Sequence, residues 1–123
     1  MRNAINSYQK IQVNTSSPLQ NIITLYEQCL RHLERLRKHI TEKDLAKKHT
    51  ALQKSMDIII ALDSNLDMTM GEIPKSLHSV YQILLSHLTQ ANIKNDVKPV
   101  ELAEELLTEL LDTWKDIQKR QKV

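Results

Sequence analysis

The chain has 123 residues, enough for one domain with a sizeable core and too few for a second domain. Its formal net charge is only +2 at pH 7, which gives little support to a nucleic-acid partner. Cys29 is the single cysteine, so an intramolecular disulfide is excluded and a reducing compartment fits best. We find no apolar run long enough to span a membrane and no secretory signal at the start, and we therefore expect a cytoplasmic protein.

Glycine is almost absent from the chain. Gly71 is the only glycine, and there is no phenylalanine. Phosphate-binding loops, tight hairpins and the strained turns that carry nucleophiles all use the access of glycine to positive φ angles. We therefore predict a helical protein that acts through its surface.

The first predicted helix begins after Ser17, which is a candidate N-cap. Pro18 suits the first helical position, and the side chain of Gln20 can reach back to the cap. From Leu19 to Ile40, apolar residues repeat at helical spacing and form one wide face. This pattern predicts an amphipathic helix that packs against a core.

The second predicted helix ends before Gly71, which is assigned to a connection. Its expected apolar face consists of Leu45, Leu52, Met56, Ile59, Ile60, Leu62 and Leu66. Ile58 lies outside this arc, so it is either an ordinary exposed residue or part of a docking groove. Leu102, in the fourth predicted helix, has the same two interpretations.

Two further helical blocks follow. The third carries its apolar face from Ile73 to Ala91, with Pro74 tolerated in the first turn. The fourth opens near Pro99, and Trp114 lies on its apolar face. We predict an all-α fold.

The four blocks pack most simply as an antiparallel four-helix bundle. It is expected to span residues 17–118. Residues 1–16 are expected to form an amino-terminal strap or short helix before it, which is either a detachable cover over an apolar groove or a permanently packed arm or frayed end, and residues 119–123 are expected to form a charged tail. Basic residues gather at 31–48 and acidic residues at 101–116, which we interpret as two solvated helix faces.

The five histidines do not show a metal-binding pattern. None forms an i, i+4 pair around a glutamate, and the acidic residues lack the Glu-x-x-His repeat of metal-binding bundles. Two of them, His49 and His87, fall within apolar arcs and are expected at the boundary of the core. Cys29 lacks an adjacent base. We predict no metal, no cofactor and no catalytic residue.

His49 supports one alternative function. With lysines on both sides, it loosely resembles the phosphorylated helix of a histidine phosphotransfer bundle. That family usually has a small residue one turn after its histidine, and Gln53 stands there in this chain.

Several segments, taken in order, carry a second and broader resemblance. They are Tyr8 to Pro18, Ile22 to Tyr26, Gly71 to Ile73, Val80-Tyr81, Ala91 to Asp96 and Trp114-Lys115. Their order and spacing resemble the FliS family of flagellar secretion chaperones over almost the whole chain. Met70, where the family often has a second glycine, and Pro74, where it has a small helix-forming residue, depart from the pattern before the third helix.

The resemblance implies a cytosolic export chaperone without catalytic activity. Such a protein binds the carboxyl-terminal segment of flagellin, prevents premature polymerisation and assists delivery to the flagellar type III export gate. The gate and a second copy of the chain are further candidate partners. The family fold is an antiparallel helical bundle whose amino-terminal segment covers an apolar surface used by flagellin.

The resemblance also indicates candidate flagellin-binding residues. Ile5 and Tyr8 match family positions tied to flagellin binding. Asn92, Asn95 and Asp96 are a weaker match, because this motif can instead end one helix and cap the next. With Ile58 and Leu102, these residues make up the predicted binding set.

Overall fold

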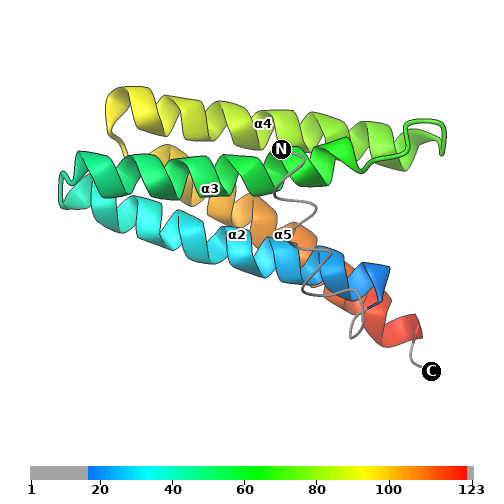
Figure 1. Cartoon of the computed structure of the whole chain (residues 1–123). Helices are drawn as coiled ribbons and strands as arrows, with labels where there is room; N and C mark the ends of the chain where they lie inside the picture. Colours follow the sequence, from blue (N-terminus) through cyan, green and yellow to red (C-terminus); the bar gives the residue numbers. More distant parts are fainter. Residues whose placement is uncertain (1–16, 122–123) are drawn as a thin grey trace.

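The computed structural model describes residues 17–121, which form four α-helices. The helices are α2 (Pro18–Thr41), α3 (Leu45–Ser64), α4 (Glu72–Lys94) and α5 (Lys98–Gln121). Successive helices run in opposite directions and are joined by short connections (Figure 1). The described part of the chain contains no strand. The prediction of an all-α, antiparallel four-helix bundle is confirmed, while the predicted strap lies outside the described residues.

The start of α2 follows the predicted cap only in part. Ser17 Oγ accepts a hydrogen bond from the Gln20 backbone N–H at 3.1 Å. The Gln20 side chain does not return to the cap. Its Nε2 donates to Thr24 Oγ1 at 3.1 Å, and its Oε1 accepts from Gln118 Nε2 at 2.7 Å. The glutamine therefore ties α2 to the end of α5, and a reciprocal capping box is not formed.

Two connections use residues with left-handed backbone conformations. After α2, Lys43 has φ 57°, its N–H donates to Ile40 O at 3.1 Å, and the next N–H donates to His39 O at 3.0 Å. These two bonds satisfy carbonyls that the last turn of a helix leaves without partners. After α4, Asn95 has φ 51° and caps the helix in the same way. Gly71, with φ 97°, precedes α4 and belongs to a connection as predicted.

The core lies between the four helices and includes two tyrosines. Tyr26 of α2 and Tyr81 of α4 are at most 2% exposed, and their hydroxyl oxygens are 2.7 Å apart. Trp114 of α5 packs edge-on against Tyr26, with ring centroids 6.4 Å apart. A buried hydroxyl needs a hydrogen-bond partner, so the tyrosine pair joins α2 to α4 across the apolar core. Trp114 is half-buried, as part of the packing around the core.

The buried face of α3 differs from the predicted one. Ile58 is only 8% exposed, so its assignment to the surface or to a docking groove is wrong. Leu45, expected in the core, is 67% exposed. The buried face also contains Ala51, Ser55 and the stem of Lys48. These three side chains are small or polar, so an apolar face identified from hydrophobic residues alone leaves them out. The face predicted without them is rotated about the helix axis and excludes Ile58.

Helix α5 continues through Lys119 and Arg120 to Gln121, into the region predicted as a charged tail. Cations in the last turn of a helix interact favourably with its dipole, which is consistent with this extension. Helix α5 also makes a bidentate ion pair with α2, in which Arg37 donates two hydrogen bonds to Glu104. The predicted basic and acidic faces therefore meet at this pair.

Candidate functional site

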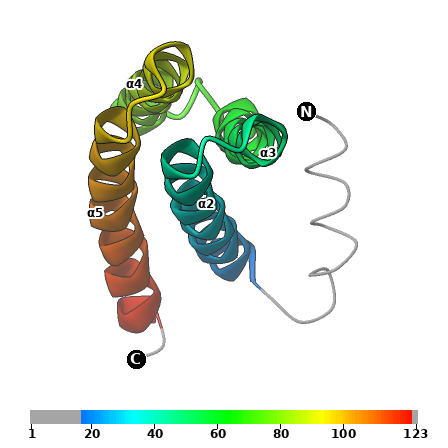
Figure 2. The ribbon, with the colours of Figure 1, turned by 90° about the vertical axis from the view of Figure 1, so that its left-hand side faces the viewer.

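The bundle opens at one end. The start of α2 and the end of α5 lie apart from the end of α3 and the start of α4, at the right of Figure 1. Figure 2, turned by 90°, shows the same separation at the far end of the molecule. Since helices that diverge leave their facing side chains with fewer neighbours, this end is where a cavity is expected.

A cavity of about 310 Å³ occupies this open end. All four helices contribute to it, and most of its lining is apolar. The lining residues are Pro18, Asn21, Ile22, Leu25, Leu62, Asn65, Leu66, Leu77, Tyr81 and Trp114. A concave apolar site with a few polar groups is the usual form of a binding site, and we call this one the apolar cavity.

The inner wall of the apolar cavity is uncharged. Tyr81 contributes its ring, and its hydroxyl is bonded to Tyr26 beneath the wall. Burial raises the pKa of Tyr26 and Tyr81 above the ordinary tyrosine value, so both hydroxyls stay protonated at neutral pH. Cys29, buried deeper, has its pKa raised to about 12 by burial and accordingly is not a nucleophile at neutral pH. This wall can make apolar contacts but offers no group for acid–base or nucleophilic catalysis.

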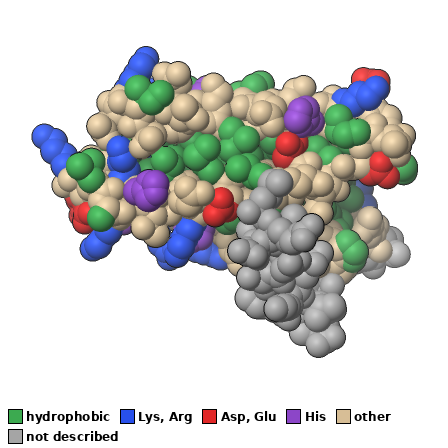
Figure 3. Space-filling model, turned by 45° about the horizontal axis from the view of Figure 1, so that its top comes forward, with side chains coloured by type: hydrophobic (Ala, Val, Ile, Leu, Met, Phe, Trp, Pro, Cys, Tyr) green, Lys and Arg blue, Asp and Glu red, His purple; other side chains and the backbone are tan. Residues whose placement is uncertain are grey.

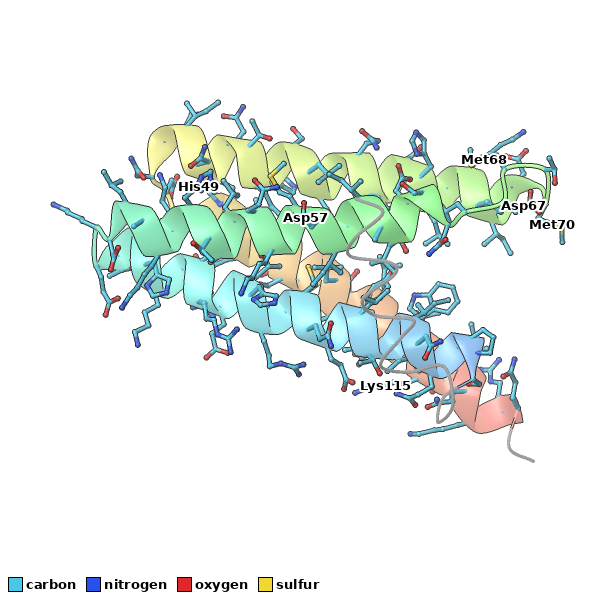
Figure 4. All side chains as sticks on the ribbon, viewed as in Figure 1. His49, Asp57, Asp67, Met68, Met70 and Lys115 are labelled. Atoms are coloured by element: carbon cyan, nitrogen blue, oxygen red, sulfur yellow. The ribbon has the colours of Figure 1, made fainter. Side chains whose placement is uncertain are left out.

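Exposed apolar side chains lie on the connection beside the apolar cavity. Figure 4 shows Met68 and Met70 on the connection between α3 and α4, at the open end of the bundle. These methionines are 44% and 72% exposed, and Ile73 at the start of α4 is 74% exposed, which contradicts its predicted place on an apolar core face. Methionine adapts its shape to different ligands and is frequent at surfaces that bind varied apolar partners.

A band of hydrophobic side chains also runs along the face that carries α3 and α4 (Figure 3). Half-buried Met56 on α3 and Val80 on α4 pack against the core, and Ile83 on α4 is 48% exposed. Exposed apolar surface next to an apolar cavity is typical of a surface that receives a partner. The band and the cavity together form the candidate binding surface.

The predicted residues of the connection between α4 and α5 lie at the opposite end of the bundle and have structural roles. Asn95 takes the left-handed conformation that ends α4, and its Oδ1 accepts a hydrogen bond from Lys48 Nζ at 2.6 Å. The backbone carbonyl of Asn92 accepts from the same Nζ at 3.4 Å. Asp96 Oδ1 accepts from the Lys98 backbone N–H at 3.0 Å, at the start of α5. These contacts fit the helix-ending interpretation of the motif.

The other predicted residues are not brought together. Leu102 is 38% exposed in the first turns of α5, away from the apolar cavity. Ile58 is buried within α3. Ile5 and Tyr8 lie outside the described residues.

His49 is exposed in the amino-terminal half of α3 (Figure 4), so its expected place at the core boundary is wrong. His87 is half-buried, as expected. Among residues 17–121, no group of three or more histidine, cysteine or acidic side chains could hold a metal ion. No helix in the described range is both long and apolar enough to cross a membrane.

Sequence reasoning did not find the apolar cavity. Ile22, Leu66, Leu77 and Trp114 were all placed on core faces by their spacing, and a core residue and a cavity residue have the same helical periodicity. The only indication was their position, since all four lie near the ends of helices that meet at one end of an antiparallel bundle.

The fold and the site together define a class of protein: a four-helix bundle with an apolar cavity at one end. Residues 1–121 match the family model described as "Flagellar protein FliS". This chain belongs to the FliS family.

Named relatives agree with this assignment. The chain is 32% identical to the flagellar secretion chaperone FliS of Bacillus subtilis, covering 94% of this chain and 86% of that protein. It is 33% identical to the Salmonella typhimurium protein of the same name, covering 92% and 88%. A crystal structure of a bacterial flagellar chaperone matches the fold with a TM-score of 0.79, at 21% identity, over 97% of this chain and 98% of that one. The family match leaves the phosphotransfer alternative without support.

Proposed function

We propose that this protein is a cytoplasmic flagellar secretion chaperone that binds the carboxyl-terminal segment of flagellin. It prevents premature polymerisation of flagellin and assists its delivery to the type III export gate, acting by binding and without catalysis. The observation that carries the proposal is the apolar cavity at the open end of the bundle in a chain that belongs to the FliS family.

The proposed ligand fits the chemistry of this surface. A segment that is disordered before assembly and becomes an amphipathic helix afterwards has apolar side chains that need temporary burial. The cavity can bury an apolar side chain of such a segment, and the exposed methionines beside it can adapt to the next ones. Because the bundle is already folded, only the ligand pays an ordering cost on binding.

The proposal assigns two further regions to recognition. Ile5 and Tyr8, in the predicted strap, are proposed to contact flagellin. Leu102 and the exposed side chains of Asn92 and Asp96 form a candidate second contact at the opposite end. Asn95 is proposed only as an indirect contributor because its amide already binds Lys48. Ile58 is not proposed because it is buried.

A charge placed in the apolar cavity tests the main proposal. Leu66→Glu puts a carboxylate at the half-buried edge of the cavity, and the matched control Leu45→Glu changes a 67% exposed residue at the start of α3. We expect Leu66→Glu to weaken flagellin binding by about tenfold or more, since burying an unpaired charge is costly, and Leu45→Glu to change it less than about twofold. The affinity is measured by titration with intact flagellin, with circular dichroism to verify folding.

Flagellin without its carboxyl-terminal residues completes the test. It should not bind to the unmodified protein. Equal affinity for truncated and intact flagellin would rule out the proposed ligand segment, and equal effects of the two glutamate variants would rule out the apolar cavity as its site.

The strap is tested separately with the double variant Ile5→Ala and Tyr8→Ala. If the two side chains touch flagellin, affinity should fall by roughly 2 kcal/mol or more, with cooperative unfolding nearly unchanged. If they only cover the apolar surface, their removal should tighten binding, because a competitor has been removed. Unchanged affinity with a large loss of stability would leave the strap with a purely structural role.

A further inference from the structure

Two neighbouring hollows near the turn between α2 and α3 are lined by cations. One, of about 160 Å³, is lined by His32, Arg35, His39, Lys47, Thr50, Ala51 and Lys54. The other, of about 300 Å³, is lined by His39, Ile40, Lys43, Leu45, Lys48 and Asn95. His39 lines both hollows, and we call the two together the basic groove. Neither lining contains a carboxylate.

Carboxylates near the basic groove do not balance its charge. Glu42 Oε1 lies 3.4 Å from His39 Nδ1, and Asp44 Oδ1 accepts from the Lys47 backbone N–H as the cap of α3. The groove has five permanent cations, one arginine and four lysines, against these two carboxylates. An excess of positive charge therefore remains. Figure 3 shows blue and purple side chains gathered at the end of the molecule that carries this turn, on the left.

A neighbouring groove shows what a balanced surface looks like in this protein. Between α2 and α5, a hollow of about 710 Å³ is lined by four cations, one of which is the Arg35 that also lines the basic groove, and by three carboxylates, those of Glu34, Glu42 and Glu101. Its Arg37 is further neutralised by two hydrogen bonds to Glu104. The basic groove has no comparable pairing. The excess of positive charge is therefore confined to the side of this end of the bundle that α2 and α3 form.

The surroundings of His32 and Lys48 also reflect the unbalanced positive charge of the basic groove. The His32 pKa is lowered, first by burial and then by the charges of Arg35, Lys54 and Arg31. Lys48 Nζ is held at the groove by two neutral acceptors, Asn95 Oδ1 and the Asn92 carbonyl. An ammonium group carries three donors, so Lys48 keeps one for a further acceptor.

The dimensions and the apolar part of the groove favour an extended ligand. His32 and His39 are seven residues apart on α2, which at the helical rise is about 10 Å. The cations are spread along this length on two helices, whereas a single phosphate would be best bound by donors that converge. Leu45, 67% exposed, adds an apolar contact at one end.

We propose that the basic groove is a docking site for an acidic segment of a partner protein, with carboxylates along the cations and an apolar side chain against Leu45. This goes beyond the proposed flagellin function, because none of the cations of the groove belongs to the residues proposed to contact flagellin. Electrostatic complementarity of this kind contributes mainly to specificity and to the rate of association.

The probe is a short labelled peptide of alternating glutamate pairs and leucines, and binding is measured by fluorescence anisotropy with the full chain. Replacing Arg35, Lys47 and Lys54 with glutamine removes three exposed charges from the groove. We expect the peptide to bind this variant about tenfold more weakly, since each exposed pair contributes modestly. Leu45→Ser should also weaken binding, by about threefold, and affinity for intact flagellin should be unchanged in both variants.

A matched control removes the same charge elsewhere. Lys75, Lys119 and Arg120 lie at the start of α4 and the end of α5, on the opposite end of the bundle. Their replacement with glutamine should change peptide binding less than about twofold. Equal losses in the two triple variants would mean that only net charge matters, and the proposal would be wrong.

Further ligands test whether the basic groove binds something other than an acidic segment. A peptide with glutamine in place of glutamate should not bind, and equal binding would overturn the role of the carboxylates. Tripolyphosphate should compete only weakly, and tighter binding than the peptide would make the groove a phosphate site instead. If the unmodified protein is a dimer that the peptide dissociates, as seen by sedimentation, the occupant is a second copy of this chain and the proposal is overturned.

The pKa of His32, followed through its NMR resonance, gives an independent measure of peptide binding in the basic groove. Its ring faces Arg35 and Arg31 from α2 and Lys54 from α3, and it approaches Arg35 Nη1 at 3.3 Å. Bound carboxylates would offset these cations, so the acidic peptide should raise the pKa of His32 in an NMR titration. A pKa unchanged by saturating peptide would place the peptide elsewhere.

Discussion

The hydrogen bond between the two buried tyrosines allows a quantitative test of how α2 and α4 are held together. Tyr26 and Tyr81 are almost fully buried, with hydroxyl oxygens 2.7 Å apart. Tyr81→Phe or Tyr26→Phe alone removes one hydroxyl and leaves the other without this partner. Leaving a buried polar group unsatisfied costs about 1 to 3 kcal/mol, and we expect each single variant to lose an amount in this range.

The double variant should behave differently from the sum of the singles. Two phenylalanines keep both rings, including the edge-on contact of residue 26 with Trp114, and leave neither buried hydroxyl. Replacing both partners by apolar groups of the same shape is nearly neutral, so we expect a loss below about 1 kcal/mol. The coupling energy of the double-mutant cycle, which is the sum of the two single losses minus the loss of the double variant, should then be at least about 1 kcal/mol.

Urea unfolding followed by circular dichroism measures these free energies, provided that the m value is the same for all four proteins. Ser79→Ala is a control, because it removes an exposed hydroxyl that donates to a carbonyl of its own helix. It should change stability by less than about 0.5 kcal/mol. A double variant whose loss equals the sum of the two single losses would refute the reasoning, since it would show that the hydroxyls do not depend on each other.

Three further predictions concern stability. Burial raises the pKa of the Cys29 thiol from 9.0 to about 12, so the thiol ionises more readily in the unfolded chain. The free energy of unfolding should therefore be unaffected by this group below about pH 9 and should fall by up to about 1.4 kcal/mol per pH unit as the pH rises toward 12. A Cys29→Ala variant whose free energy of unfolding falls equally steeply between about pH 9 and 10 would contradict this. Asn95→Ala should be about 1 kcal/mol less stable than Asn95→Gly in urea unfolding, because both lose the bond to Lys48 and only alanine is strained at positive φ; equal stabilities would argue against the left-handed cap. Trp114→Ala should cost about 1 to 3 kcal/mol, less than the 3 to 5 typical of a fully buried aromatic residue, because the ring is half-buried, and a larger loss in thermal or urea unfolding would show that it acts as a core residue.

Much of the fold could be predicted from local patterns in the sequence. Apolar spacing located the four helices, and Ser17, Gly71 and Asn95 marked places where the chain starts or leaves a helix. These signals are local, because a cap or a left-handed residue acts on the backbone within a few residues of itself. The family resemblance rested on the same kind of evidence, the order of short segments along the chain.

Errors arose where burial depends on the neighbouring helix. Ile58 is buried and Leu45 exposed because α3 packs through small and polar residues such as Ser55, whose buried hydroxyl donates to the carbonyl of Ala51 in its own helix. Hydrophobicity alone cannot identify such a face. The hydrogen bond of Gln20 to Gln118 was missed for the same reason, since its partner is 98 residues away in sequence.

Sequence by itself determined that this chain forms amphipathic helices, that they pack around one core, and which family the order of its segments resembles. Only the tertiary structure placed the apolar cavity at one end and the basic groove at the other. Helical periodicity depends on residues within a turn or two of each other and can therefore be recognised in the sequence alone. The cavity depends on how far four helices diverge, and the groove on which charges α2 and α3 place side by side without a carboxylate between them, and both are properties of several helices at once.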